Sequence, residues 1–169
     1  METPGHILVV SWLTPNCSQT IQVGISLAGK YQARLSVIHV MDTTWLKGWS
    51  VPMVSMEQER KREMESNKEK LHAIIENENK KDMIIREHVR EGAPAEVVLK
   101  FIEAEQIDLL ILRSQAETRL ERLLVGGSND EIIRAMPCSI YLVKQDPCAL
   151  DEEVETDDDV WEDHDVTVN

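Results

Sequence analysis

The clearest chemical signal in the sequence is a glycine pair followed by a serine, Gly126-Gly127-Ser128, directly ahead of a helical pattern at residues 128–136. The free backbone N–H groups and the positive end of a helix can hold a phosphate at such a place. The same residues also suit a plain turn in which Ser128 caps the helix. In the first interpretation, Arg113 would add its charge to an anion site. The residues alone leave both interpretations open.

Residues suited to catalysis or metal binding show no supporting pattern. The histidines lack metal-ligand spacing, and we interpret His39 and His88, which lie in strand patterns, as structural. No GxSxG motif occurs, and neither Ser11 nor Cys17 has a base that the sequence makes visible. GxGxxG and GxxxxGK[ST] motifs are absent as well. The sequence therefore predicts no enzyme, no metal site and no dinucleotide site.

Five apolar runs must position these residues, at 6–12, 35–41, 83–89, 107–112 and 138–143. Runs that are apolar at most positions are typical of strands covered on both faces of a parallel sheet. Helical patterns separate them, first around Ile21, Ile25 and Ala28 and then at 55–81, 94–105 and 128–136. The alternation predicts a three-layer α/β/α fold of Rossmann-like type, with a five-stranded parallel sheet in one domain over residues 1–145. Asp108, at the start of the fourth strand pattern, is predicted to serve a turn.

Charge is distributed unevenly along the 169 residues, whose formal net charge is −13. Segment 146–169 is rich in Asp and Glu and holds no Lys or Arg, so the preceding domain is nearly balanced. We expect this acidic segment to be a disordered tail, because it cannot bury enough apolar surface to offset chain entropy. A balanced domain with an acidic tail disfavours nucleic acid as a partner.

The remaining composition favours a cytoplasmic protein. No apolar run reaches the roughly 18–20 residues of a membrane helix, and we expect no secretory signal. The three cysteines, Cys17, Cys138 and Cys148, show no CxxC spacing and are predicted to be free thiols. The long connection 42–54 carries Trp45 and Trp49, which could form a contact patch or fold over the sheet edge.

Three segments in order resemble the universal stress protein family over residues 5–145. Segment 89–100 resembles the G-x-P-A-x-x-I-L stretch of the family. Segment 106–112 resembles its I-D-L-I-V-M strand, and segment 136–144 resembles its closing A-P-C-P-V-L-V-V strand. The resemblance implies an adenine-nucleotide-alpha-hydrolase-like sheet with strand order 3-2-1-4-5. It also implies a homodimer formed edge to edge through the last strand, at Ile140, Tyr141, Leu142 and Val143.

The chain departs from the nucleotide-binding branch of that family at both halves of the site. The branch carries G-x2-G-x9-G-[ST] after strand four, where this chain has Arg113, Ala116 and then Gly126-Gly127, with Ser128 one place later. Its aspartate after strand one is matched by Trp12. We therefore expect a non-catalytic, stress-associated interaction dimer that binds neither ATP nor AMP and contacts a protein partner through the acidic tail or the tryptophan loop. The alternative is nucleotide or anion binding by a modified loop of Arg113 and Gly126–Ser128.

Overall fold

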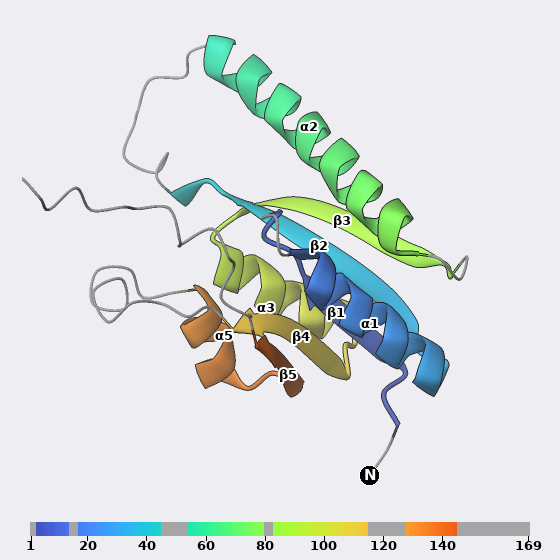
Figure 1. Cartoon of the computed structure of the whole chain (residues 1–169). Helices are drawn as coiled ribbons and strands as arrows, with labels where there is room; N and C mark the ends of the chain where they lie inside the picture. The colour runs from blue at the N-terminus through green and yellow to red at the C-terminus, as the bar shows by residue number, and fades with distance from the viewer. Residues whose placement is uncertain (1–2, 14–16, 45–53, 80–82, 115–127, 145–169) are drawn as a thin grey trace, which may run out of the picture.

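Strands and helices alternate along the chain (Figure 1). The computed structural model describes residues 3–13, 17–44, 54–79, 83–114 and 128–144. The elements in chain order are β1 (His6–Val10), α1 (Cys17–Tyr31), β2 (Arg34–Asp42), α2 (Val54–Glu78), β3 (Ile85–Gly92), α3 (Pro94–Glu105), β4 (Leu109–Ser114), α5 (Ser128–Ala135) and β5 (Ser139–Lys144). These elements are the predicted ones, with ends that differ by a few residues.

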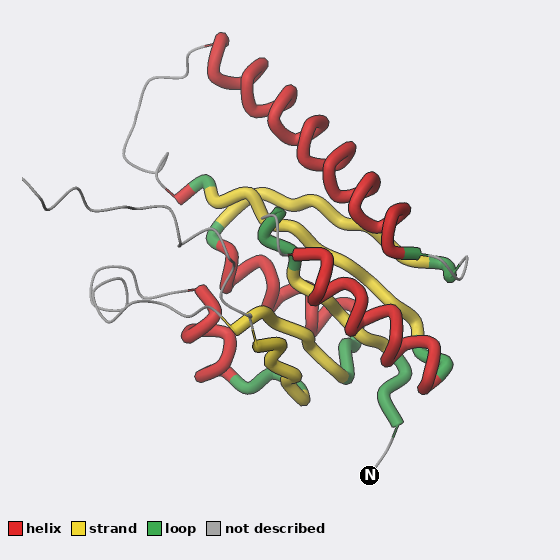
Figure 2. Tube along the Cα trace, in the orientation of Figure 1, coloured by secondary structure: helices red, strands yellow, loops and turns green. Residues whose placement is uncertain are grey.

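The five strands form one parallel sheet in the order β3-β2-β1-β4-β5, which confirms the predicted fold and strand order. Helices cover both faces of the sheet, as the red and yellow elements of Figure 2 show. Helices α1 and α2 pack on one face, and α3 and α5 pack on the other. The carboxyl ends of the strands therefore meet at one edge of a three-layer domain, where ligands of such sheets bind.

Strand β1 lies at the centre of the sheet, and every one of its residues is buried there. Its side chains alternate, so that Ile7 and Val9 join the core under α1 and α2 while Leu8 and Val10 join the core under α3 and α5. Helix α1 approaches this strand closely at Gly24, where an added Cβ would lie 2.5 Å from a Val9 methyl. Glycine at this position lets α1 pack directly on the sheet.

A hydrogen-bonded junction joins the amino ends of β1 and β4. The carboxylate Oδ2 of Asp108 accepts hydrogen bonds from the backbone N–H of Gly5 at 2.8 Å and of His6 at 2.9 Å. The His6 ring lies 3.1 Å from the carbonyl oxygen of Glu105 through Nδ1 and 2.9 Å from the Ser36 hydroxyl through Nε2. The sequence predicted a turn role for Asp108, whereas its carboxylate joins the start of β4 to the residues at the start of β1, and the buried His6 extends this junction to β2 and to the end of α3.

Strand β3 differs most from its sequence pattern, which placed an apolar run at 83–89. The strand runs from Ile85 to Gly92 and is largely polar, because it is an edge strand with one side open. Two contacts connect it to α2, an ion pair of Arg60 with Glu91 at 2.8 Å and a hydrogen bond between His72 and Glu87 at 3.0 Å. The first turns of α2 project beyond the other elements (Figure 1).

No helix in the described part of the chain combines the length and the apolar character needed to cross a membrane.

Candidate functional site

A tryptophan follows β1 at the carboxyl edge of the sheet. Trp12 lies two residues after the end of β1, and its half-buried ring packs against the core that β1 shares with α3 and α5. The indole Nε1 is buried and meets no hydrogen-bond acceptor among the described residues. The chain turns at the next residue, Leu13, whose φ is 52°. An apolar ring therefore occupies the end of β1, where the sequence resemblance implies a carboxylate in a nucleotide site.

At the end of β4, an asparagine holds the start of α5. Asn129, the second residue of α5, is only 8% exposed, and its Nδ2 donates to the carbonyl oxygen of Arg113 at 3.1 Å. This bond fixes the first turn of α5 against the end of β4, where Arg113 is half-buried. Because the first N–H groups of a helix have no partner within the helix, a group that accepts hydrogen bonds would be favoured here. The sequence analysis did not identify Asn129.

His39 connects the carboxyl ends of β1 and β2. Its Nδ1 lies 2.8 Å from the carbonyl oxygen of Ser11, and because a carbonyl only accepts, Nδ1 carries the hydrogen. Burial lowers the pKa of His39 below its usual 6.5, although the hydrogen bond to the Ser11 carbonyl opposes this. The ring is therefore neutral at pH 7. It bonds to the backbone of Ser11 and is not placed as a base for its hydroxyl, in agreement with the predicted structural role.

A cavity of about 230 Å³ opens beside His39, between the end of β2 and α2. Asp42, the last residue of β2, and Thr43 line the cavity on one side, and Glu63 and Asn67 of α2 line it on the other. Asn67 is only 9% exposed. Arg60 also lines the cavity but is paired with Glu91, so the carboxylates of Asp42 and Glu63 disfavour a phosphate on this side of the carboxyl edge.

Several predicted site residues lie outside the described part of the chain. Nothing in the structure describes the side chain of Ser128, although its backbone begins α5. The other predicted residues that lie outside are Ala116, Gly126, Gly127, Trp45, Trp49 and segment 146–169. The structure places Trp12 and Arg113 at the ends of adjacent strands, β1 and β4, so these two predicted residues belong to the same edge.

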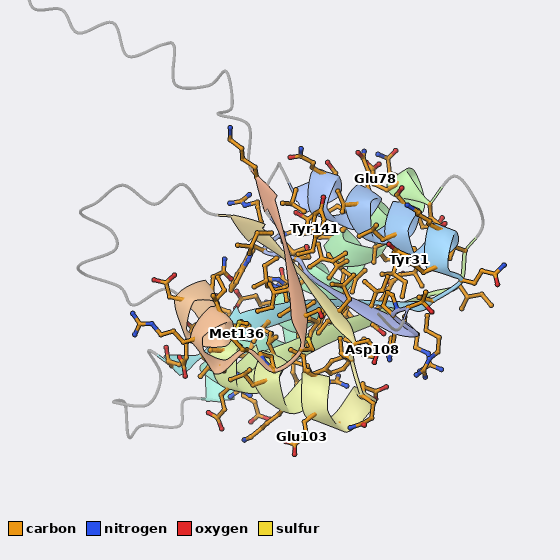
Figure 3. The ribbon with its side chains drawn as sticks, turned by 90° about the horizontal axis from the view of Figure 1, so that it is seen from below. Tyr31, Glu78, Glu103, Asp108, Met136 and Tyr141 are labelled. Atoms are coloured by element: carbon orange, nitrogen blue, oxygen red, sulfur yellow. The ribbon has the colours of Figure 1, made fainter. Side chains whose placement is uncertain are left out.

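Strand β5, the predicted dimer strand, is at one edge of the sheet. Tyr141 is 47% exposed and Leu142 is 50% exposed, whereas Val143 is buried in the core. Ile140 is half-buried and packs against the core under α3 and α5. Figure 3 shows Tyr141 on β5 and the exposed Met136 at the turn that precedes this strand. The outer surface of β5 therefore presents large apolar side chains next to an open strand edge.

The described residues contain no group of three or more His, Cys, Asp or Glu side chains placed to hold a metal ion. Cys138 is a free thiol, as predicted, and burial raises its pKa, which keeps it in the less reactive thiol form near neutral pH. The two most buried histidines, His6 and His39, are both engaged by backbone carbonyls. In the described part of the chain the Ser36 hydroxyl lies beside the His6 ring, but both residues are fully buried, so this pair joins strands and is not accessible to a substrate.

Comparison with known proteins gives a consistent result. The model of the Universal stress protein family matches residues 4–144. A curated relative, Universal stress protein MJ0531 of Methanocaldococcus jannaschii, is 25% identical over 127 residues, which cover 72% of this chain and 71% of the relative. A putative universal stress protein of Staphylococcus aureus is 22% identical over 128 residues, covering 75% of this chain and 76% of the relative.

Solved structures share the fold. The hypothetical protein MJ0577 superposes with a TM-score of 0.69 at 20% identity, covering 86% of this chain and 99% of that one. A universal stress protein in complex with cAMP superposes with a TM-score of 0.57 at 15% identity, covering 84% of this chain and 98% of that one.

Proposed function

The chain belongs to the universal stress protein family, and from that premise we propose that it acts without catalysis, as a stress-associated interaction dimer that does not use ATP. Its partners are proteins, in a cytoplasmic setting, and neither nucleic acid nor a membrane takes part. Beyond the family assignment, the proposal states that the carboxyl edge of the sheet does not form an ATP site.

The observation that carries the proposal is the packing of Trp12. Its ring is half-buried against the core at the end of β1, and it cannot accept a hydrogen bond from a ribose hydroxyl. A nucleoside at this place would have to displace the ring and leave the apolar residues beneath it uncovered. Across the edge, Arg113 carries a side chain where the glycine pattern of the family brings bare backbone to the phosphates. Both changes disfavour the same ligand.

Calorimetry with Mg-ATP tests this proposal. The wild-type chain should give no saturable heat, and Trp12→Phe should give none either, because it keeps an apolar ring. The double variant Trp12→Asp/Arg113→Gly should bind more tightly than Trp12→Phe, since it restores a carboxylate and removes a side chain at the phosphate position. Wild-type binding with a dissociation constant of about 10 μM or tighter, near −7 kcal/mol, would contradict the proposal.

A second candidate function, anion binding, is favoured by the bond between Asn129 and the Arg113 carbonyl. This bond fixes the start of α5 at the carboxyl edge, where helix N–H groups and Arg113 could hold a phosphate. Titration with inorganic phosphate and with cAMP tests this candidate. Arg113→Ala should weaken binding more than Ser128→Ala, while Arg134→Ala, in the last turn of α5, should have little effect. Equal binding by all four proteins would exclude the site.

The dimer is proposed to form through β5. Its open edge can pair with the same strand of a second copy, and the exposed Tyr141 and Leu142 would be covered in that contact. The acidic segment 146–169 begins directly after Gln145, so it follows this strand closely in the sequence. We propose that it is an acidic tail that follows the domain of residues 1–145.

A further inference from the structure

The outer side of β3 is the second open edge of the sheet, opposite β5. β3 pairs only with β2 in the described structure, so the main-chain N–H and C=O groups on its outer side lack a strand partner there. Figure 1 shows β3 at this edge, with α2 on one of its faces. An eight-residue edge strand with free backbone groups is a place where an extended segment can add as a further strand.

Charge on β3 separates between its two faces. Glu87 and Glu91 face α2, and both are paired there with His72 and Arg60. Arg86 and Arg90 lie on the other face, in register with Ser36 and Val40 of β2. Glu91 is therefore neutralised by Arg60, and Glu87 is bonded to His72, while the arginines of the strand start from its opposite face.

The arginines of that face have few partners. Arg86 lies 3.9 Å from Glu105, a distance too long for a hydrogen bond, and the Arg86 side chain is 54% exposed. Arg34, at the start of β2 on the same face, and Arg90 form no ion pair with a described residue. Ile84, one residue before β3, is 88% exposed. This edge thus combines positive charge with an exposed aliphatic side chain.

A groove of about 420 Å³ runs between β3 and α2 along the same edge. Leu71 and Val89 form its apolar part, while Lys68, Glu69 and Arg90 are among the charged residues that line it. Arg90 curls around the edge, with its Nη1 donating to the carbonyl oxygen of Val89 at 3.3 Å. The groove can therefore take one apolar side chain from a segment that pairs with β3.

We propose that segment 146–169 of this same chain binds along the outer edge of β3, with its carboxylates toward Arg34, Arg86 and Arg90 and one of its apolar residues, Val160 or Trp161, in the groove. The segment has the complementary charge, since it is rich in Asp and Glu and has no Lys or Arg. Val160 and Trp161 are adjacent and are flanked by Asp159 and Glu162, which matches a basic edge with a single apolar groove.

The reach of the segment allows this contact. Four strand spacings of about 4.8 Å put β3 roughly 19 Å from β5, whereas 24 residues can extend to about 80 Å. A tether of this length keeps the segment at an effective concentration on the order of 1 mM near the edge, so a weak contact is enough. The bound segment would cover an edge that could otherwise pair with another chain. This inference does not depend on the proposed function at the carboxyl edge.

Amide hydrogen exchange of the full chain at residues 85–92 tests the proposal. At about 20 mM salt, the outward amides should exchange about tenfold more slowly than at about 500 mM salt, because salt screens the ion pairs. Arg86→Ala/Arg90→Ala and Asp157→Asn/Asp158→Asn/Asp159→Asn should each lose this protection at low salt. The control Lys30→Ala/Arg134→Ala removes two positive charges elsewhere and should keep it.

Three results would overturn the proposal. The first is exchange at β3 that does not depend on salt in the wild-type chain, a measurement that needs no variant to fold. The second is equal exchange in the wild type and in both test variants, with circular dichroism showing all of them folded. The third is protection that rises with protein concentration, which would assign the edge to a second copy of the chain.

Discussion

Replacing His6 by alanine should lower the free energy of unfolding by about 3–4 kcal/mol. The side chain is fully buried and contacts the Glu105 carbonyl at 3.1 Å and the Ser36 hydroxyl at 2.9 Å. Two lost hydrogen bonds account for roughly 2 kcal/mol, and the cavity left by the ring adds about 1–2 kcal/mol. Because domains of this kind are stable by only about 5–15 kcal/mol, the loss should be large enough to measure easily.

Urea unfolding at pH 7.5, followed by circular dichroism, measures this loss. The midpoint should fall while the slope with denaturant stays unchanged, which indicates that stability and not compactness has changed. Ser36→Ala should give a smaller loss, because it removes only one of the two contacts. A double-mutant cycle with both substitutions should then show coupling between the two residues.

The matched control is His72→Ala on α2. His72 is exposed, and its pair with Glu87 lies at the surface, so this substitution should change the midpoint little. A loss for His6→Ala below about 1 kcal/mol, or one no greater than that of the control, would refute the view that His6 holds the amino ends of β1, β2 and β4 together.

Three further predictions follow from the same structure. In sedimentation at about 10 μM, the wild-type chain should be a dimer, and the Tyr141→Lys variant should show a larger monomer fraction. A monomeric wild type would contradict pairing through β5. Gly24→Ala should lower the melting temperature, because the added Cβ would lie 2.5 Å from a valine methyl of β1. Gly29 is exposed on the same helix, so Gly29→Ala should raise the melting temperature slightly. The reverse order of the two variants would contradict the packing of α1. Burial lowers the pKa of His39 and of His88, so the unfolded chain binds more protons than the folded chain below about pH 6.5. The urea midpoint should therefore be lower at pH 5.5 than at pH 7.5, and a midpoint that does not change with pH would contradict this.

The fold was predictable from the sequence because the central strands carry the strongest pattern. Every residue of β1 is buried, and β2 is buried at all but its two ends, so both appear as nearly continuous apolar runs. Edge strand β3 was misplaced by several residues, since only Val89 is buried in it and its other positions are largely polar. The strand order came from the resemblance of segments such as 106–112, because an apolar run does not specify its neighbours.

The candidate site was only partly predictable. Trp12 and Arg113 were predicted as site residues because they stand where a family pattern has other residues, and the structure places both at the carboxyl edge. Asn129 and Asn67 were missed, because a buried asparagine in a helix has no periodicity that separates it from an exposed one. Its role appears only when the fold brings it against β4, as with Asn129, or against a cavity beside β2, as with Asn67.

The two edges of the sheet differ in a way that limits assembly. β5 presents Tyr141 and Leu142 beside an open edge, which favours pairing with another copy. β3 presents Arg86 and Arg90, and two copies brought together there would place like charges opposite each other. If β5 pairs with β5 around a twofold axis, that edge is used up in both copies, and each dimer then ends in two β3 edges. Growth into a longer sheet would require β3 to pair with β3, which the arginines oppose and a bound acidic segment would block. In a dimer of this kind, the same difference in edge chemistry would limit growth of the sheet to two copies.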